Sequence, residues 1–348
     1  MADLSEADPV RVAFRTGAGS AVGLGHLSRC LALAHALRTL GAESRVLIDG
    51  DHRALELALA AGFEASAVAH ADDPDATLEW CGRLGASALV VDSYGFTPDD
   101  LAVLVAAGRP VAVFDDTANR ELPVDLVING GAGARALPYR GGPRTRYLLG
   151  PSYLALRPEF AEAAPRTIHD DVRRALVTLG GADPGRLVAP LVRWAIAGLG
   201  AITLDVVAGP LVDDVASVRA AVGAVAGPVV LHESPKHLRD LMLAADLAVT
   251  GGGQTVYELA ATGTPMVAIG LAANQTPNVD AMRAAGALAY AGDVHDAALG
   301  PGLVATLAAL ATDPGRRADM SRRGRALVDG RGAPRVARAL LDLIGRRR

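Results

Sequence analysis

The chain has few of the residues on which disulfide-linked, zinc-binding and nucleic-acid-binding proteins rely. Its only cysteines, Cys30 and Cys81, cannot build a disulfide framework, and no group of cysteines and histidines has the spacing of zinc ligands. Aromatic residues make up 4% of the 348 residues, so few rings are available to stack on bases or sugars. A net charge of −4 gives no basic surface for nucleic acid. We therefore expect no metal, no cofactor and no nucleic-acid partner.

Hydrophobic runs with the length and purity of a membrane span are also lacking. The uncharged stretch 259–279 contains Gly, Pro, Asn and Gln, which is not typical of a membrane helix. The first ten residues, MADLSEADPV, are acidic and show no hydrophobic region of a signal peptide. We expect a cytoplasmic protein with no stable membrane insertion.

What the sequence does contain is a regular alternation of short apolar strands and helices. This alternation predicts an α/β fold with parallel sheets, crossover helices and ligands at the carboxyl ends of the strands. In the first half, strands are expected at 11–15, 44–48, 88–92, 110–114 and 125–128, and helices at about 26–40 and 53–61. In the second half, strands are expected at 174–179, 202–208, 229–231, 247–250 and 266–270.

The length predicts two such domains, because 348 residues exceed one ordinary core. A polar, proline-containing stretch, 158–173, is predicted to link an N-terminal domain, 1–157, to a C-terminal domain, 174–331. The last stretch, 332–348, is predicted to be a helix with apolar residues on one side and arginines elsewhere. We interpret its basic face as solvated rather than as a membrane-surface element.

A phosphate site is predicted in the second half, where Asp246 to Gln275 reads DLAVTGGGQTVYELAATGTPMVAIGLAANQ. An apolar strand runs into three glycines, which let the backbone approach a ligand closely. The helix that follows presents free N–H groups and the positive end of its dipole, which suit a diphosphate. Thr255 adds a hydroxyl donor, and Glu258 lies within the first turn, where it accepts hydrogen bonds from a ribose. On spacing alone, an ordinary strand–turn–helix is an equal alternative.

The motif G-G-Q-T-V-Y-E, followed by A-T-G-T-P and N-Q, resembles the C-terminal nucleotide-sugar site of the MurG-type glycosyltransferases. The resemblance implies that the glycine turn binds the diphosphate and that the glutamate binds the ribose. A second glycine pair follows the strand expected at 174–179, and we place it on the other side of the diphosphate. The nucleotide-binding residues that we assign are Gly180, Gly181, Gly252, Gly253, Gln254, Thr255, Glu258, Asn274 and Gln275.

A second group of chemically active residues lies near the start of the chain, where Arg15 to Cys30 reads RTGAGSAVGLGHLSRC. His26 falls between the first strand and the first helix, so it is expected at the mouth of that helix, facing the cleft between the domains. An imidazole titrates near neutrality and can act as a general base. A capping or core position is the alternative, and it is the commoner role of a single histidine.

The pattern R-x-G-x-G-S-x-x-G-x-G-H-x-x-R-C is similar to the opening of a hydrolase family of pseudaminic acid biosynthesis, PseG and its SpsG-like relatives. More of the chain follows that family: a D-x-Y segment ending at Tyr94, the paired acids Asp115 and Asp116, Asn129 after a strand, and a G-x-x-Y-x-x-L-R element ending at Arg157. The resemblance runs from about residue 11 to about residue 278.

The resemblance implies a GT-B architecture, with two Rossmann-like domains facing each other across a cleft. It implies that water displaces UDP from a UDP-sugar with inversion and without a metal. It transfers the role of general base to His26, and the positioning of the sugar or the base to Asp92 and Tyr94. The substrate-binding residues that we assign are Arg15, Gly25, Arg29, Asn129, Tyr153 and Arg157. On sequence alone, the arginines at 29 and 157 are either contacts to an anionic ligand or interdomain ion pairs.

Two positions depart from the family pattern. Gly17 and Gly19 stand where the family has an aspartate and a serine. A missing carboxylate removes a charge-assisted hydrogen bond of about 1.5–3 kcal/mol to the group that it would hold. This departure indicates a different sugar or acceptor rather than different chemistry.

Three functions remain open on the sequence. The preferred hypothesis is a nucleotide-sugar hydrolase, most simply of a UDP-sugar, in which His26 activates water. The second is a glycosyltransferase on the same scaffold, in which His26 deprotonates an acceptor. The third is a catalytically silent nucleotide-sugar binding protein, which the presence of His26 makes the weakest of the three. The choice between the first two depends on whether the pocket excludes an acceptor.

Overall fold

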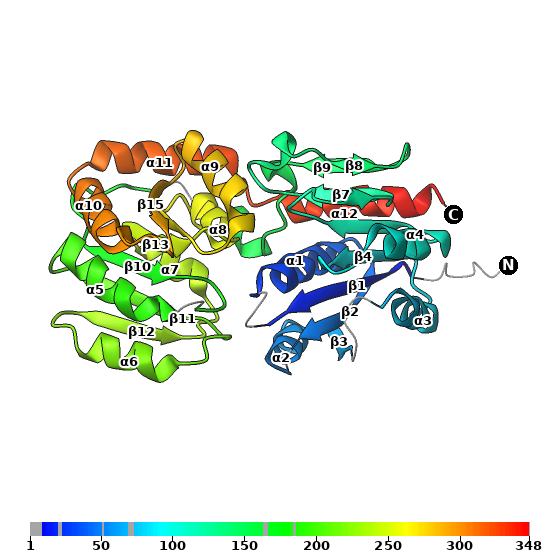
Figure 1. Ribbon diagram of the computed structural model, residues 1–348, viewed down its shortest axis with the longest axis horizontal. Coiled ribbons are helices and arrows are strands. Elements are labelled where there is room, and N and C mark those ends of the chain that lie inside the picture. Colours follow the sequence, from blue (N-terminus) through cyan, green and yellow to red (C-terminus); the bar gives the residue numbers. More distant parts are fainter. Residues whose placement is uncertain are drawn as a thin grey trace, which may run out of the picture.

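The computed structural model describes residues 9–19, 23–50, 52–68, 73–162, 166–183 and 186–347. Figure 1 shows two α/β lobes side by side, one formed mainly by the first half of the chain and one by the second half. Each lobe contains its own parallel sheet. The predicted α/β class with two Rossmann-like lobes is therefore confirmed.

The N-terminal sheet has seven parallel strands in the order β3-β2-β1-β4-β5-β7-β9. Its strands are β1 (Arg11–Ala18), β2 (Glu43–Gly50), β3 (Glu64–Ala67), β4 (Ala88–Asp92), β5 (Val111–Phe114), β7 (Leu126–Asn129) and β9 (Arg146–Leu149). The helices of this lobe are α1 (Gly25–Thr39), α2 (His52–Ala60), α3 (Pro74–Leu84) and α4 (Pro98–Ala106). A separate two-stranded sheet is formed by β6 (Glu121–Leu122) and β8 (Arg140–Gly141).

The C-terminal sheet has six parallel strands in the order β12-β11-β10-β13-β14-β15. Its strands are β10 (Arg174–Thr178), β11 (Thr203–Ala208), β12 (Val229–Glu233), β13 (Leu247–Gly251), β14 (Met266–Gly270) and β15 (Ala289–Asp293). The helices of this lobe are α5 (Val188–Leu199), α6 (Val215–Gly223), α7 (Leu238–Ala244), α8 (Thr255–Thr262), α9 (Thr276–Ala284), α10 (Leu299–Ala311) and α11 (Pro314–Leu327).

Both sheets are buried on their two faces, which explains why their central strands are continuous apolar runs. Along β1, Val12 and Phe14 belong to one hydrophobic cluster while Ala13 belongs to another on the opposite face. The strands predicted from sequence are all present, with ends shifted by a few residues. The sequence missed the edge strands β3, β9 and β15, because edge strands lack a fully buried run and show exposed or half-buried positions instead.

The last helix, α12 (Gly332–Gly345), packs on the N-terminal lobe although it follows the C-terminal sheet in sequence. Its apolar side chains Val336, Leu340 and Ile344 join the same cluster as Leu33 and Leu37 of α1. Figure 1 shows this red helix lying within the lobe that carries the blue strands. The chain thus passes from the N-terminal lobe to the C-terminal lobe and then returns. Its last helix packs in the core of the N-terminal lobe.

We predict that Leu340→Ala lowers the free energy of unfolding by about 2–5 kcal/mol, because Leu340 is fully buried and the shortened side chain leaves a cavity. Denaturant unfolding followed by circular dichroism would measure this loss. Arg338→Ala on the exposed side of the same helix is the matched control and should change stability by less than about 0.5 kcal/mol. Equal effects of the two substitutions would contradict the place of α12 in this core.

None of the helices formed by the described residues combines the length and the apolar character needed to cross a bilayer. The cytoplasmic location expected from the sequence stays a prediction.

Candidate active site

The loops at which the two sheets reverse their strand order face each other. In the N-terminal sheet the order reverses between β1 and β4, and in the C-terminal sheet it reverses between β10 and β13. In open parallel sheets, ligands bind outside the carboxyl ends of the strands at such reversal points. A cleft of about 900 Å³ lies there and is lined by residues from both lobes. This volume is within the usual range of small-molecule sites.

Most of the site residues assigned from sequence line this cleft. The N-terminal lobe contributes Gly25, His26, Arg29, Tyr94 and Arg157. The C-terminal lobe contributes Gly180, Gly181, Gly252, Gly253, Gln254, Thr255, Glu258, Asn274 and Gln275. The structure therefore brings together two groups of residues from different halves of the chain, while their individual roles stay predictions.

The turn between β13 and α8 brings backbone close to the cleft. At Gly252 an added Cβ would lie 2.5 Å from Cγ2 of Val279, so no larger residue fits there without displacing its neighbour. No side chain caps the first N–H groups of α8, which begins at Thr255. The side chain of Gln275 lies beside the turn, where its Oε1 accepts a hydrogen bond of 3.2 Å from the backbone N–H of Leu271. The N–H groups of Val256 and Tyr257 donate to the carbonyls of Gly253 and Gln254 at 3.3 and 3.0 Å, and the positive end of the α8 dipole suits a phosphate group.

Glu258 borders the same turn from the first turn of α8 and is 7% exposed. Burial raises the pKa of its carboxyl group, and the guanidinium of Arg157 opposes this rise. Nη2 of Arg157 lies 3.4 Å from Oε1 of Glu258, and the Nη1 atom lies 3.0 Å from Oε1 of Glu159. Arg157, at the end of the N-terminal domain, therefore forms an ion pair with the C-terminal lobe at the wall of the cleft.

His26 lies in the first turn of α1 and is 8% exposed. Its Nδ1 is 3.3 Å from Oδ1 of Asp92, at the end of β4, although the two atoms do not have the alignment of a hydrogen bond. The ring of Tyr94 meets the imidazole edge to face, with 4.8 Å between ring centroids and an interplanar angle of 81°. The imidazole is thus held between a buried carboxylate and an aromatic ring at the wall of the cleft.

Arg29, on the next turn of α1, binds two carboxylates at once. Its Nε and Nη2 donate to the two oxygens of Asp92 at 2.6 and 2.7 Å, and its Nη1 donates to Asp116 at 2.6 Å. Its guanidinium also lies over the ring of Phe114, 5.0 Å from the centroid. Since both ends of the fork are engaged inside the protein, this geometry favours a positioning role over the direct substrate contact assigned from sequence.

The charges of this cluster are set by burial and pairing together. Burial disfavours the ionised form of Asp116, but the attraction of Arg29 outweighs it and holds the pKa of Asp116 below its usual value. Oη of Tyr94 donates to Asp116 at 3.0 Å, and burial together with that carboxylate raises the pKa of Tyr94 well above its usual value. Tyr94 therefore carries its proton at neutral pH and acts as a hydrogen-bond donor at the cleft.

Four residues assigned from sequence do not line the cleft. Asp92 is fully buried beneath Arg29 and His26, so it acts only through them. Arg15 is also fully buried, because the alternation of β1 turns its side chain toward Phe96 on the opposite side of the lobe, 5.9 Å from that ring. The substrate contact that we assigned to Arg15 is not supported by this position.

The other two residues outside the cleft hold loops together. The side chain of Asn129 donates to Oη of Tyr139 at 2.7 Å and accepts from the N–H of Gly131 at 2.8 Å. Tyr153 lies in a short 3₁₀ helix, Pro151–Tyr153, and packs against the core of the N-terminal lobe. Direct contact of either residue with a substrate is not supported, because their polar groups or rings face the protein.

The structure adds cleft residues that the assignment from sequence left out. Asp116 was noted only as one of two paired acids, yet it lines the cleft and accepts from Arg29 and Tyr94. Lys236 lines the cleft from the loop between β12 and α7. Both follow a parallel strand at its carboxyl end, so strand ends were the available signal.

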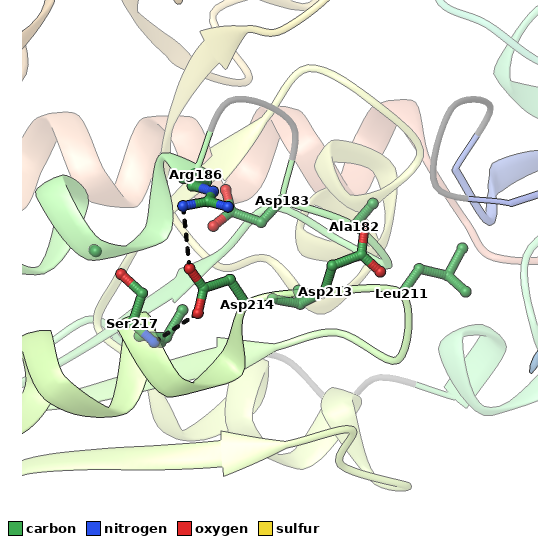
Figure 2. Close-up of a pocket in the computed structure, with 10 residues that line it drawn as sticks. Ala182, Asp183, Arg186, Leu211, Asp213, Asp214 and Ser217 are labelled. Atoms are coloured by element: carbon green, nitrogen blue, oxygen red, sulfur yellow. Dashed lines mark hydrogen bonds and ion pairs between the residues drawn. The ribbon is translucent and has the colours of Figure 1, made fainter.

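A second hollow of about 440 Å³ shares Ala182 with the cleft (Figure 2). Three aspartates line it, and each has a partner. Asp183 and Asp214 accept backbone hydrogen bonds at the starts of α5 and α6, and Asp213 pairs with Arg53 of the N-terminal lobe at 3.1 Å. These carboxylates cap helices or join the lobes, so we assign no ligand to this hollow. Among the described residues, no three histidine, cysteine or acidic side chains stand together as metal ligands.

Comparisons with proteins of known structure identify the arrangement of the two lobes. The chain superposes on MurG of Acinetobacter baumannii with a TM-score of 0.66 and 15% identity, covering 96% of this chain and 100% of that one. It superposes on the glycosyltransferase SnogD from Streptomyces nogalater with a TM-score of 0.67 and 18% identity, covering 97% and 100%. Both are GT-B glycosyltransferases.

The chain has the GT-B fold. A further GT-B neighbour is the spinosyn rhamnosyltransferase SpnG complexed with thymidine diphosphate, with a TM-score of 0.64, 18% identity and coverage of 96% and 99%. The predicted GT-B architecture with a cleft between two lobes is therefore confirmed. At these identities the likeness concerns the fold alone.

Two proteins are similar to this chain in sequence, each over about two thirds of its length or more. The spore coat polysaccharide biosynthesis protein SpsG of Bacillus subtilis is 28% identical over 240 residues, which is 67% of this chain and 69% of that protein. The uncharacterized protein MJ1062 of Methanocaldococcus jannaschii is 22% identical over 260 residues. That match covers 72% of this chain but only 53% of the relative. No protein-family model matches the chain.

Proposed function

We propose that this protein is a nucleotide-sugar-dependent enzyme that transfers a glycosyl group from a nucleoside diphosphate sugar, with UDP as the nucleotide, to an acceptor. The observation that carries the proposal is one cleft lined by both the phosphate-binding turn at α8 and the imidazole of His26. The GT-B fold, whose neighbours named above are glycosyltransferases, favours an organic acceptor over water. The similarity to SpsG, named for polysaccharide biosynthesis, agrees with a sugar substrate.

In the proposed reaction the C-terminal lobe holds the leaving group. The diphosphate binds at the N–H groups of the glycine turn and of the first turn of α8, and Glu258 accepts hydrogen bonds from the ribose hydroxyls. Negative charge develops on the diphosphate as the anomeric C–O bond breaks. The positive end of the α8 dipole stabilises that charge without a metal.

The N-terminal lobe deprotonates the acceptor. The carboxylate of Asp92 faces Nδ1 of His26, so the tautomer with the proton on Nδ1 is favoured and Nε2 is left as the base. The acceptor hydroxyl gives its proton to Nε2 while its oxygen attacks the anomeric carbon, and the nucleoside diphosphate leaves from the opposite side. Arg29 donates hydrogen bonds to the carboxylates of Asp92 and Asp116. Tyr94 donates a hydrogen bond to Asp116 and keeps its proton throughout the reaction.

Hydrolysis is the second candidate, because the G-x-G-H segment that positions His26 is the element on which the resemblance to the hydrolase family rests. Water in place of the acceptor would then give the free sugar with inverted configuration. Both reactions would use His26 as the base and the same nucleotide site, and they differ only in whether an acceptor hydroxyl or water attacks the anomeric carbon.

A panel of UDP- and dTDP-sugars, incubated with and without candidate acceptors, tests the proposal. Release of the nucleoside diphosphate that requires an acceptor would support glycosyl transfer. Release of the nucleoside diphosphate in water alone, with proton NMR showing the inverted anomer of the fresh sugar, would show that the enzyme is a hydrolase and not a transferase. Nucleotide binding with no release from any sugar would contradict an enzymatic role and leave a binding protein.

We predict that Glu258→Gln weakens UDP binding by about 10- to 100-fold, because a neutral amide replaces the carboxylate that accepts from the ribose. Isothermal titration calorimetry with UDP measures the change. Glu159→Gln is the matched control, since Glu159 pairs with the same arginine but does not line the cleft. Equal affinities of Glu258→Gln and the unchanged protein would remove Glu258 from the nucleotide site.

A further inference from the structure

The cleft is closed at one end by direct contact between the lobes. At Gly131 an added Cβ would lie 2.1 Å from Oδ1 of Asn278, and at Gly133 it would lie 2.6 Å from the carbonyl oxygen of Pro277. Between them, the N–H of Ala132 donates to Oη of Tyr257 at 2.9 Å. Since the backbone of residues 131–133 is in direct contact with Tyr257, Pro277 and Asn278 here, a nucleotide whose diphosphate sits at the α8 turn has no room to extend past α9.

The cleft continues in the other direction, along the carboxyl ends of β10, β11 and β12. Three strand spacings of about 4.8 Å separate β13 from β12, which is roughly 14 Å and comparable to the reach of an extended nucleotide. The loops at this end present mainly apolar surface, from Val207, Pro210, Pro235 and Leu238. A nucleobase at this end of the cleft would therefore pack against apolar side chains.

The loop after β12 is held in a defined conformation. Ser234 adopts a left-handed backbone with φ of 46°, which is uncommon for a residue other than glycine, asparagine or aspartate. Its N–H donates to the carbonyl of Ala208, at the end of β11, at 2.8 Å. Two residues later, Lys236 lines the cleft. Lys236 is also the sole lysine in a chain that otherwise uses arginine for its cationic side chains.

We propose that Lys236 is a specificity-determining residue that selects a pyrimidine with a carbonyl at position 4, uracil or thymine, over cytosine. The inference rests on the proposed nucleotide-binding function and goes beyond it by naming the residue that reads the base. A lysine ammonium has three donors and no acceptor. The O4 atom of uracil or thymine accepts from it, whereas cytosine presents an amino donor at the same place. Apart from Ser234, the neighbouring side chains of Val207, Pro210, Pro235 and Leu238 are apolar and offer cytosine no compensating acceptor.

Calorimetric titration of the full chain and of Lys236→Met with UDP, CDP and inorganic pyrophosphate tests the proposal. The unchanged protein should bind UDP about tenfold or more tightly than CDP. In Lys236→Met, UDP affinity should fall to that of CDP while CDP and pyrophosphate affinities stay the same. A retained preference for UDP in the variant would overturn the proposal. An equal loss for all three ligands would overturn it too, by making Lys236 a general phosphate contact.

A second measurement observes Lys236 directly in the unchanged protein and uses the variant only to assign its signal. Reductive methylation with ¹³C-formaldehyde labels the single lysine and the N-terminal amine, and the two dimethylamino signals are distinguished in the Lys236→Met spectrum. UDP should shift the lysine signal strongly and CDP should shift it weakly, and equal shifts would contradict the proposal. Failure of every nucleoside diphosphate to bind would refute the proposed function itself. Equal binding of UDP and CDP by the unchanged protein would refute only the role of Lys236.

Discussion

Replacing His26 with alanine is expected to lower kcat by about 10²- to 10⁴-fold while leaving the Kd for UDP nearly unchanged. The reason is the division of the cleft between the lobes. The imidazole lies on α1 beside Asp92, whereas Glu258 lies on α8 and the proposed diphosphate-binding turn lies between β13 and α8. Steady-state kinetics with the sugar donor found active in the panel, together with UDP calorimetry, would separate the two quantities.

The matched control for this prediction is His35→Ala. His35 lies on the same helix but does not line the cleft, so its replacement should leave kcat unchanged. Urea unfolding of both variants would show whether a lower rate reflects lost structure. A fall in UDP affinity equal to the fall in rate would refute the assignment of His26 to the acceptor side.

Replacing Arg29 with methionine is expected to lower the free energy of unfolding at pH 7 by about 3–5 kcal/mol. The substitution leaves Asp92, which is fully buried, and Asp116 without the cation that neutralises them. Arg38→Met is the matched control on α1, because Arg38 is exposed and its loss should cost less than about 1 kcal/mol. Denaturant unfolding measures both changes.

The loss in Arg29→Met should shrink as the pH falls. In the unchanged protein the pKa of Asp116 is lowered, so its contribution to stability is complete above the ordinary aspartate range and is lost as the pH falls through that range. Without Arg29, burial raises the pKa of this carboxyl, opposed only by the smaller effects of His26 and of the hydrogen bond from Tyr94. The variant then gains stability on acidification while the unchanged protein loses it. A difference in unfolding free energy that is constant between pH 7 and pH 4.5 would contradict this account.

Arg29→Lys distinguishes positioning from simple charge. A lysine keeps the cation but cannot form the two parallel hydrogen bonds to Asp92 together with the third to Asp116. Much of the stability should return in this variant, whereas kcat should stay low because the carboxylates that orient His26 are no longer held in place. Full recovery of kcat would mean that charge alone is needed.

Much of the N-terminal site was predictable because its residues follow strands. His26 follows β1 and Tyr94 follows β4, and the carboxyl ends of parallel strands meet at one edge of a sheet. Arg15 and Asn129 were assigned to the substrate from the family resemblance, and they do not line the cleft. The direction of a side chain depends on strand alternation and on loop hydrogen bonds, which a motif does not contain.

The class of fold follows from the sequence alone, and the sequence also predicts a phosphate-binding role for the glycine turn. Both depend on local physics: apolar runs bounded by turns form buried strands, and glycines before a helix expose its N–H groups. Only the tertiary structure decided which cleft residues meet across the lobes. The three hydrogen bonds of Arg29 to two carboxylates, the place of α12 on the N-terminal core, and the position of Lys236 opposite the closed end of the cleft all depend on long-range packing. No local pattern encodes such contacts, because each joins segments that are far apart in the chain.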